Sequence, residues 1–193
     1  MDLQRKGSEV IYTKMVVFIA LFFAMTYQIA YGKDTLSPVA VIHQFYEDVS
    51  HNRWDEAPYW WIEQQRVELK GFFENENNIR EKKGLYNLKE AKLVMWKELP
   101  YEYGLSYVPS EYMDFFTKDK KIYYVGVNYT VHKQTQSFID GTNYFLIAMV
   151  RENGDWKIAL TTHVTVSSII EDGHGFGTED ECTYDKRRLK DVD

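Results

Sequence analysis

The sequence predicts an α+β domain in which N-terminal helices pack on one face of an antiparallel sheet. Apolar residues recur at helical spacing over 38–52, near the start of the chain, whereas strict two-residue alternation appears over 123–132. An Asn-Gly pair at 153–154 then joins two apolar runs, as in a β-hairpin. Helices that precede the strands, instead of alternating with them, are typical of this fold class.

The first helix is predicted from residue 38, because Ser37 and Pro38 suit the N-cap and the first helical position. The apolar residues that repeat at helical spacing, up to Asn52, are Val39, Ile42, Phe45, Tyr46 and Val49. A second, short helix is expected near 54–57, leading into the aromatic residues 59–61. The polar stretch 72–82 is expected to form a third.

Four strands are expected in the second half of the chain. The first covers 91–99 and ends at Pro100, after which 101–119 is predicted to be a loop. In the second, over 123–132, apolar and more polar residues alternate, which predicts a strand with two distinct faces. The third covers 142–151 and the fourth covers 156–168. The turn between them, 152–155, contains Asn-Gly, which tolerates the positive φ of tight hairpins.

The N-terminus predicts export from the cytoplasm. Basic residues within 1–14 precede the apolar run 15–25, and the small residues Ala30 and Gly32 suit a signal peptidase. Polar residues interrupt the run before it reaches the roughly 20 residues of a membrane span, which favours cleavage after Gly32 over an uncleaved anchor. In either case we expect the remainder to be extracytoplasmic, secreted or membrane-anchored through residues 1–32.

Behind this segment we expect one domain over 33–170 and a disordered, acidic tail over 171–193. The tail is predicted because its charged, glycine-rich sequence has little to bury. Residues 1–32 hold three basic and two acidic residues, so the rest of the chain has a net charge of −7. This acidity disfavours a nucleic-acid partner. Cys182 is the only cysteine, so no intrachain disulfide can form.

Two stretches carry a resemblance to a known family. Residues 51–57, His-Asn-Arg-Trp-Asp-Glu-Ala, resemble the turn between the first two helices, and residues 154–158, Gly-Asp-Trp-Lys-Ile, resemble the start of the last strand. Together they resemble the nuclear transport factor 2-like superfamily, also called SnoaL-like or ketosteroid-isomerase-like, as an exported bacterial member. The resemblance implies a cone-shaped, cystatin-like curved sheet wrapped around a helix, with a pocket between them. The isomerases of this superfamily carry an acidic catalytic base just after the second helix. In this chain the corresponding stretch, 59–63, is mostly aromatic, and its only acidic residue, Glu63, is displaced from the position of that base.

Aromatic density makes residues 54–61 the first candidate binding site, because one helix face cannot bury so many rings. Burial in an ordinary core is the alternative. The candidate ligand-binding residues are Trp54, Tyr59, Trp60, Trp61, Tyr124 and Asn128.

Two histidines are candidates for proton transfer, since imidazole titrates near neutral pH. His132 and His163 fall on the more polar face of their predicted strands, with Tyr124, where a curved sheet could gather them. Exposed or hydrogen-bonded sheet residues are the alternative. The histidine spacings match no metal site, and we expect no metal or cofactor.

The function favoured by the sequence is therefore non-enzymatic binding of a small apolar ligand or a protein partner at the cell envelope. An isomerase, dehydratase or hydrolase is the alternative, with His132, His163 or Glu63 as general base and Tyr124 as hydrogen-bond donor. A third possibility is a structural protein that forms a homodimer through an open face of its sheet.

Overall fold

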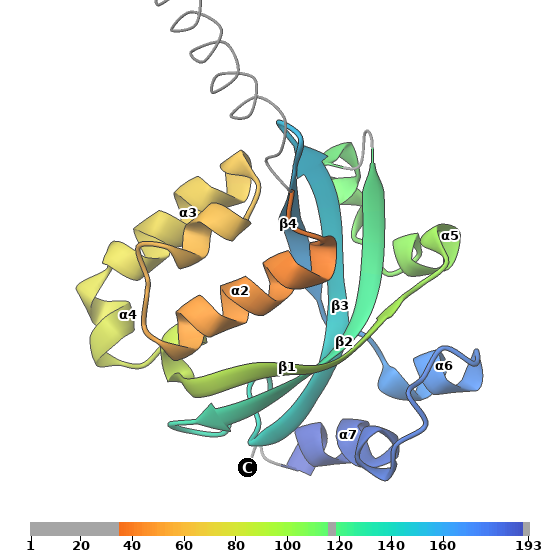
Figure 1. Ribbon diagram of the computed structural model, residues 1–193. Helices are drawn as coiled ribbons and strands as arrows, with labels where there is room; N and C mark the ends of the chain where they lie inside the picture. The colour runs from red at the N-terminus through yellow and green to blue at the C-terminus, as the bar shows by residue number, and fades with distance from the viewer. Residues whose placement is uncertain (1–34, 116–118, 191–193) are drawn as a thin grey trace, which may run out of the picture. The chain divides into compact units, whose positions relative to one another are not determined.

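The structure is a computed structural model that describes residues 35–115 and 119–190 (Figure 1). The predicted export segment, residues 1–32, lies outside the described residues. Within them the fold is α+β, as predicted: four strands form one antiparallel sheet in the order β1-β2-β3-β4, with helices beside it. No helix in the described ranges has both the length and the hydrophobicity needed to cross a membrane.

Helix α2 (Pro38–Ser50) begins where the sequence predicts. The Ser37 hydroxyl accepts a hydrogen bond of 3.2 Å from the N–H of Ala40, and Pro38 occupies the first turn. One face of α2, including Phe45 and Ile42, is buried against the sheet. The sheet bends around this helix (Figure 1). The apolar periodicity of 38–52 therefore marks the face that packs on the strands.

The segment after α2 differs in part from the prediction. A 3₁₀ turn, η1 (Ala57–Trp60), replaces the second helix, and α3 (Glu63–Glu74) begins nine residues before the predicted third helix. Asn75 ends α3 and caps α4 (Glu76–Arg80), since its side chain accepts from the N–H of Asn77 at 3.0 Å. A further 3₁₀ turn, η2 (Gly84–Asn87), leads into the sheet.

All four strands are present, with some changes of boundary. They are β1 (Leu88–Glu98), β2 (Lys120–Val131), β3 (Gly141–Glu152) and β4 (Asp155–Thr162). The turn between β3 and β4 is the predicted hairpin, in which Asn153 and Gly154 have φ values of 53° and 88°. The predicted loop after β1 contains the short helix α5 (Tyr101–Leu105) and the 3₁₀ turn η3 (Ser110–Phe115). Strand β4 ends six residues early, because the chain turns into helix α6 (Val166–Glu171).

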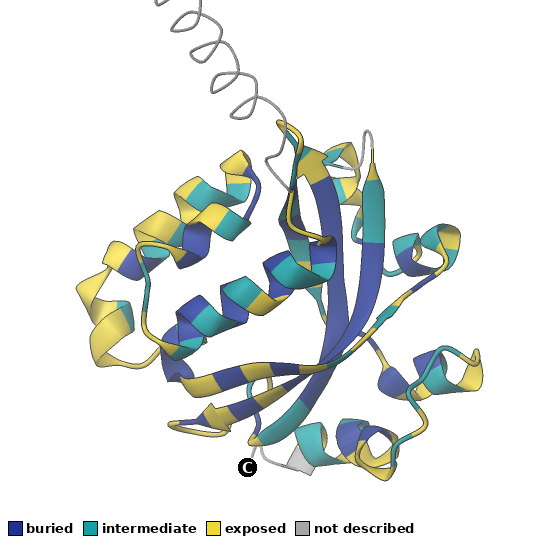
Figure 2. Cartoon of the chain, in the orientation of Figure 1, coloured by how far each residue is buried: buried dark blue, intermediate teal, exposed yellow. Residues whose placement is uncertain are grey.

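The sheet separates two hydrophobic cores. One lies between the sheet and α2, where Val125, Val127 and Tyr129 of β2 pack on Phe45 and its neighbours. The other lies on the opposite face, where Tyr124 of β2 packs with residues of the C-terminal segment. Figure 1 shows α2, α3 and α4 on one side of the sheet, and α5, α6 and α7 on the other. The central strands are accordingly buried on both faces (Figure 2).

The prediction of a disordered tail is wrong for residues 171–190. Helix α7 (Glu179–Lys190) covers the second face of the sheet, and its Tyr184 is only 1% exposed. Helix α7 also holds α6 in place, because the Asp185 carboxylate accepts from the N–H groups of Val166 and Ser167. Polar contacts, which hydropathy does not register, contribute to this docking beside the apolar packing of the segment. The C-terminal segment thus covers part of this face of the sheet.

Candidate functional site

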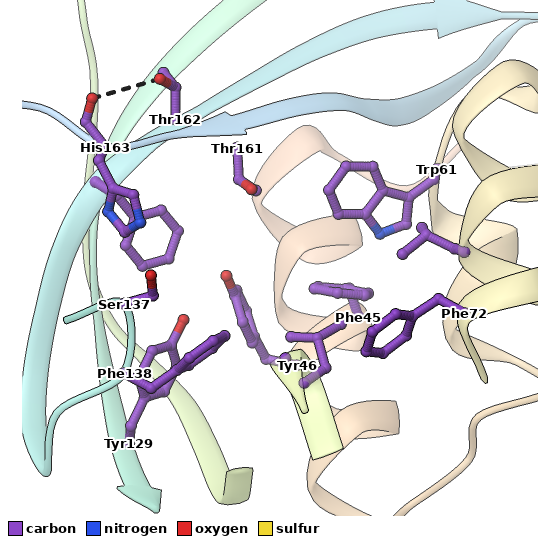
Figure 3. Close-up of a pocket in the computed structure, with 14 residues that line it drawn as sticks. Phe45, Tyr46, Trp61, Phe72, Tyr129, Ser137, Phe138, Thr161, Thr162 and His163 are labelled. Atoms are coloured by element: carbon purple, nitrogen blue, oxygen red, sulfur yellow. Dashed lines mark hydrogen bonds between the residues drawn. The ribbon is translucent and has the colours of Figure 1, made fainter. Parts of the chain in front are cut away.

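A cavity of about 310 Å³ lies between α2, α3 and the face of the sheet on which α2 packs. Its walls come from segments far apart in the sequence: α2, the residue after η1, α3, η2, three strands and the loop that precedes β3 (Figure 3). The size is at the lower end of the range of small-molecule sites. It suits a compact ligand of one or two rings.

The walls are mainly aromatic and aliphatic. The apolar lining residues are Phe45, Tyr46, Trp61, Leu69, Phe72, Leu85, Tyr129, Phe138 and Phe145. Among the described residues that line the cavity there is no Lys, Arg, Asp or Glu. An ion inside it would lose its hydration without gaining a counter-charge, so the interior favours uncharged ligands.

Trp61 is a lining residue with a buried hydrogen-bond donor that has no partner. The side chain is buried, and its indole Nε1 has no hydrogen-bond partner. The indole meets the ring of Phe45 edge to face, with ring centroids 5.5 Å apart and an interplanar angle of 78°. Figure 3 shows both rings at the same end of the cavity. Most buried donors find a partner, so this N–H is an exception that a ligand could explain.

Two tyrosine hydroxyls also belong to this cavity. Tyr46 of α2 and Tyr129 of β2 lie beside each other, with ring centroids 6.3 Å apart. Burial raises the pKa of both well above the usual value, so both stay neutral at physiological pH. The pair therefore brings hydroxyl groups but no charge to the wall.

The end of the cavity away from Trp61 is polar. Ser137, Thr162 and His163 line it, and His163 is also exposed to solvent. Figure 3 shows His163 across the cavity from Trp61, with Thr161 between them. Loss of hydration lowers the pKa of His163 below its usual 6.5, and the charge of Arg188 lowers it further. The imidazole is therefore neutral at physiological pH and can donate or accept a hydrogen bond.

Of the aromatic candidates in residues 54–61, the structure places only Trp61 in the cavity. Trp54 packs on Phe73 and Tyr86 in the core, with ring centroids 5.2 and 4.6 Å away. Trp60 donates its Nε1–H to the buried carboxylate of Asp48 at 2.5 Å. Tyr59 is half exposed, and the cations of Arg66 and Lys70 lie over its ring. The alternative of ordinary core packing therefore describes Trp54 and, in part, Trp60.

Tyr124 and Asn128 lie on the face of the sheet opposite the cavity. Tyr124 is fully buried beneath the C-terminal segment, where its ring stacks on Phe176 with centroids 4.8 Å apart. Asn128 lies on the same face of β2 and is exposed. The expected polar patch of these residues with the histidines is therefore not assembled.

His132 and Glu63 are also outside the cavity. His132 is exposed just after β2, where the loss of hydration and the charges of Lys82 and Lys89 lower its pKa. The carboxylate of Glu63 is exposed and pairs with Arg66 at 2.9 Å. Among the candidate bases, the structure brings only His163 to the cavity. Within the described residues, no three His, Cys, Asp or Glu side chains are close enough together to hold a metal ion.

Sequence reasoning missed the sheet side of the cavity, namely Tyr129 and Phe145. The signal was present in the alternation of β2, because its apolar face had to pack against the apolar face of α2. The apolar face of β2 therefore lines the cavity between helix and sheet, whereas its more polar face lies on the other side of the sheet.

Comparisons with protein-family models, with curated proteins and with solved structures found no match to this chain.

Proposed function

We propose that the domain is a non-enzymatic binding protein that holds a small, uncharged, largely apolar molecule in the cavity between α2, α3 and the sheet. The observation that carries the proposal is the cavity itself: about 310 Å³, walled by aromatic side chains and without a lining carboxylate or ammonium group. Apolar ligands bind such sites because they leave water, and the preformed walls need little reordering.

The proposed setting combines this binding with export. The apolar segment at 15–25 supports a role outside the cytoplasm, at the cell envelope. A nuclear transport factor 2-like cone is the architecture we propose, since a pocket between the first helices and the sheet is where that resemblance expects one. The ligand would be captured from the surroundings of the envelope.

A second candidate function is general-base catalysis by His163, because this imidazole lines the cavity and has a lowered pKa. The hydrogen-bond donor foreseen for the reaction, Tyr124, is buried on the other face of the sheet. If the domain is such a catalyst, the wild type should turn over a carbonyl substrate, and His163→Ala should abolish that turnover. If the purified protein shows no such turnover, binding alone remains.

Butylbenzene, titrated into the protein by calorimetry, tests the binding proposal. Leu69→Trp on α3 would fill the cavity, whereas Val67→Trp adds the same ring to the same helix at an exposed position. We expect saturable binding by the wild type and Val67→Trp, and at least about a tenfold loss in Leu69→Trp, equivalent to ~1.4 kcal/mol. Absence of binding, or equal affinity in a folded Leu69→Trp protein, would refute the proposal.

A further inference from the structure

We infer that the ligand carries an uncharged hydrogen-bond acceptor of the carbonyl type, which accepts a hydrogen bond from the indole N–H of Trp61. The inference rests on the proposed function, since it concerns the same cavity. It narrows the ligand from any small apolar molecule to ketones, esters, amides and similar compounds with an apolar body. The polar atom of such a ligand lies at the Trp61 end of the cavity.

The position of Trp61 is set by its main chain. Its N–H donates to the carbonyl of Pro58 at 3.1 Å, and its carbonyl accepts from Arg66 at 3.2 Å. Trp61 also forms a parallel bridge with Ile158 at the edge of β4. With the backbone fixed on both sides, the indole is held as a wall of the cavity.

The neighbouring indole shows what a satisfied donor looks like in this protein. Trp60 Nε1 reaches the carboxylate of Asp48, whereas Trp61 Nε1 has no oxygen or nitrogen partner although only 8% of the residue is exposed. The ring of Phe45 lies against the indole, and a π face is a weaker acceptor than an oxygen. A ligand oxygen would therefore supply what the fold leaves out.

The acceptor is expected to be neutral. The lining residues include no Lys or Arg, and Arg188, whose charge acts on His163, is not among them. A carboxylate beside Trp61 would exchange its hydration for a single neutral donor, which is unfavourable. A carbonyl oxygen gives up much less hydration and needs fewer donors in return.

Two probes of nearly the same shape test the inference. Acetophenone has a carbonyl oxygen where α-methylstyrene has a CH₂ group, and both are small enough for the cavity. Their affinities are measured for the wild type and for Trp61→Phe, which keeps an aromatic ring but removes the donor. Trp96→Phe is the matched control, because Trp96 lies on β1 outside the cavity and is 51% exposed.

The expected result concerns the change in the ratio of the two affinities between wild type and variant, because the difference in hydrophobicity between the probes cancels in that comparison. Trp61→Phe should lower the preference for acetophenone, relative to α-methylstyrene, by about threefold to tenfold. Trp96→Phe should leave the ratio unchanged. If both probes bind and Trp61→Phe does not change the ratio, the inference is overturned and the proposed function stands. If neither probe binds, both fail.

A measurement on the wild type alone covers the case in which Trp61→Phe does not fold. In ¹H–¹⁵N spectra, the indole N–H that shows a nuclear Overhauser effect to the bound probe's methyl group is followed during titration. Acetophenone should move this proton resonance downfield, as a new hydrogen bond does, and α-methylstyrene should not. The same shift with both probes, or none with acetophenone at saturation, would overturn the inference.

Discussion

The hydroxyl of Tyr124 on β2 donates a hydrogen bond of 2.8 Å to the carboxylate of Glu181 on α7. The same carboxylate accepts from the backbone N–H groups of Phe176 and Gly177 at 2.8 and 2.9 Å. Glu181 is only 1% exposed, and a buried carboxylate is tolerated only where donors surround it. This cluster ties the C-terminal segment to the sheet, on the face opposite the cavity.

Tyr124→Phe should therefore destabilise the protein. The substitution keeps the ring that stacks on Phe176 but removes one donor from the buried Glu181 carboxylate. We expect the free energy of unfolding, measured by urea denaturation, to fall by about 1–3 kcal/mol. Tyr59→Phe is the control, since Tyr59 is half exposed, and its effect should stay within about 0.5 kcal/mol. Equal stability of the two variants would contradict the role of the cluster.

Ending the chain after residue 170 should weaken the fold. The shortened protein would lose Glu181 and Tyr184 and expose the buried rings of Tyr124 and Tyr144 on the second face of the sheet. We expect self-association in size-exclusion chromatography, and a melting temperature lower by at least about 5 °C in any monomer that remains. A monomer with unchanged melting temperature would mean that residues 171–190 do not belong to the domain.

Protonation of His163 at acid pH should lower the free energy of unfolding. Its pKa in the folded protein lies below 6.5, so the folded state binds fewer protons than the unfolded state as the pH falls past that value. The stability contributed by neutral His163 is thus present above pH 6.5 and is lost as the pH falls through the folded pKa. His163→Gln removes this loss.

Urea midpoints of the wild type and His163→Gln at pH 8 and pH 5 provide the measurement. His132, whose pKa is also lowered, is present in both proteins and cancels in the comparison. The wild type should lose more stability than His163→Gln between the two pH values. An equal loss in both proteins would show that the pKa of His163 is not lowered by folding.

Local signals were enough to predict the helices and strands with strong patterns. Ser37 and Pro38 predicted the start of α2, and Asn153 with Gly154 predicted the hairpin, because each places a backbone or capping requirement on a few adjacent residues. Helix α7 was missed for the opposite reason. Its attachment depends on Glu181, a charged residue that accepts a hydrogen bond from Tyr124 of β2, 57 residues away in the sequence, as well as from residues just before the helix.

The candidate site could be predicted only in part, and the reason is the parity of β2. Tyr124 and Tyr129 are an odd number of residues apart, so they point to opposite faces of the sheet. The more polar face was expected to line the pocket, whereas the apolar face that includes Tyr129 does so. Trp61, one of the residues singled out by aromatic density, lines the cavity, but nothing in the sequence separates it from Trp60, whose indole N–H is already paired with Asp48.

The most direct test of the central claim is the location of a bound apolar molecule. Intermolecular nuclear Overhauser effects should connect saturating butylbenzene to the side chains of Phe45, Trp61 and Phe145, which wall the cavity. No such effects should reach Ile169, which is buried on the other face of the sheet. Contacts confined to the second face, or no contacts at saturation, would contradict the assignment of the cavity as the binding site.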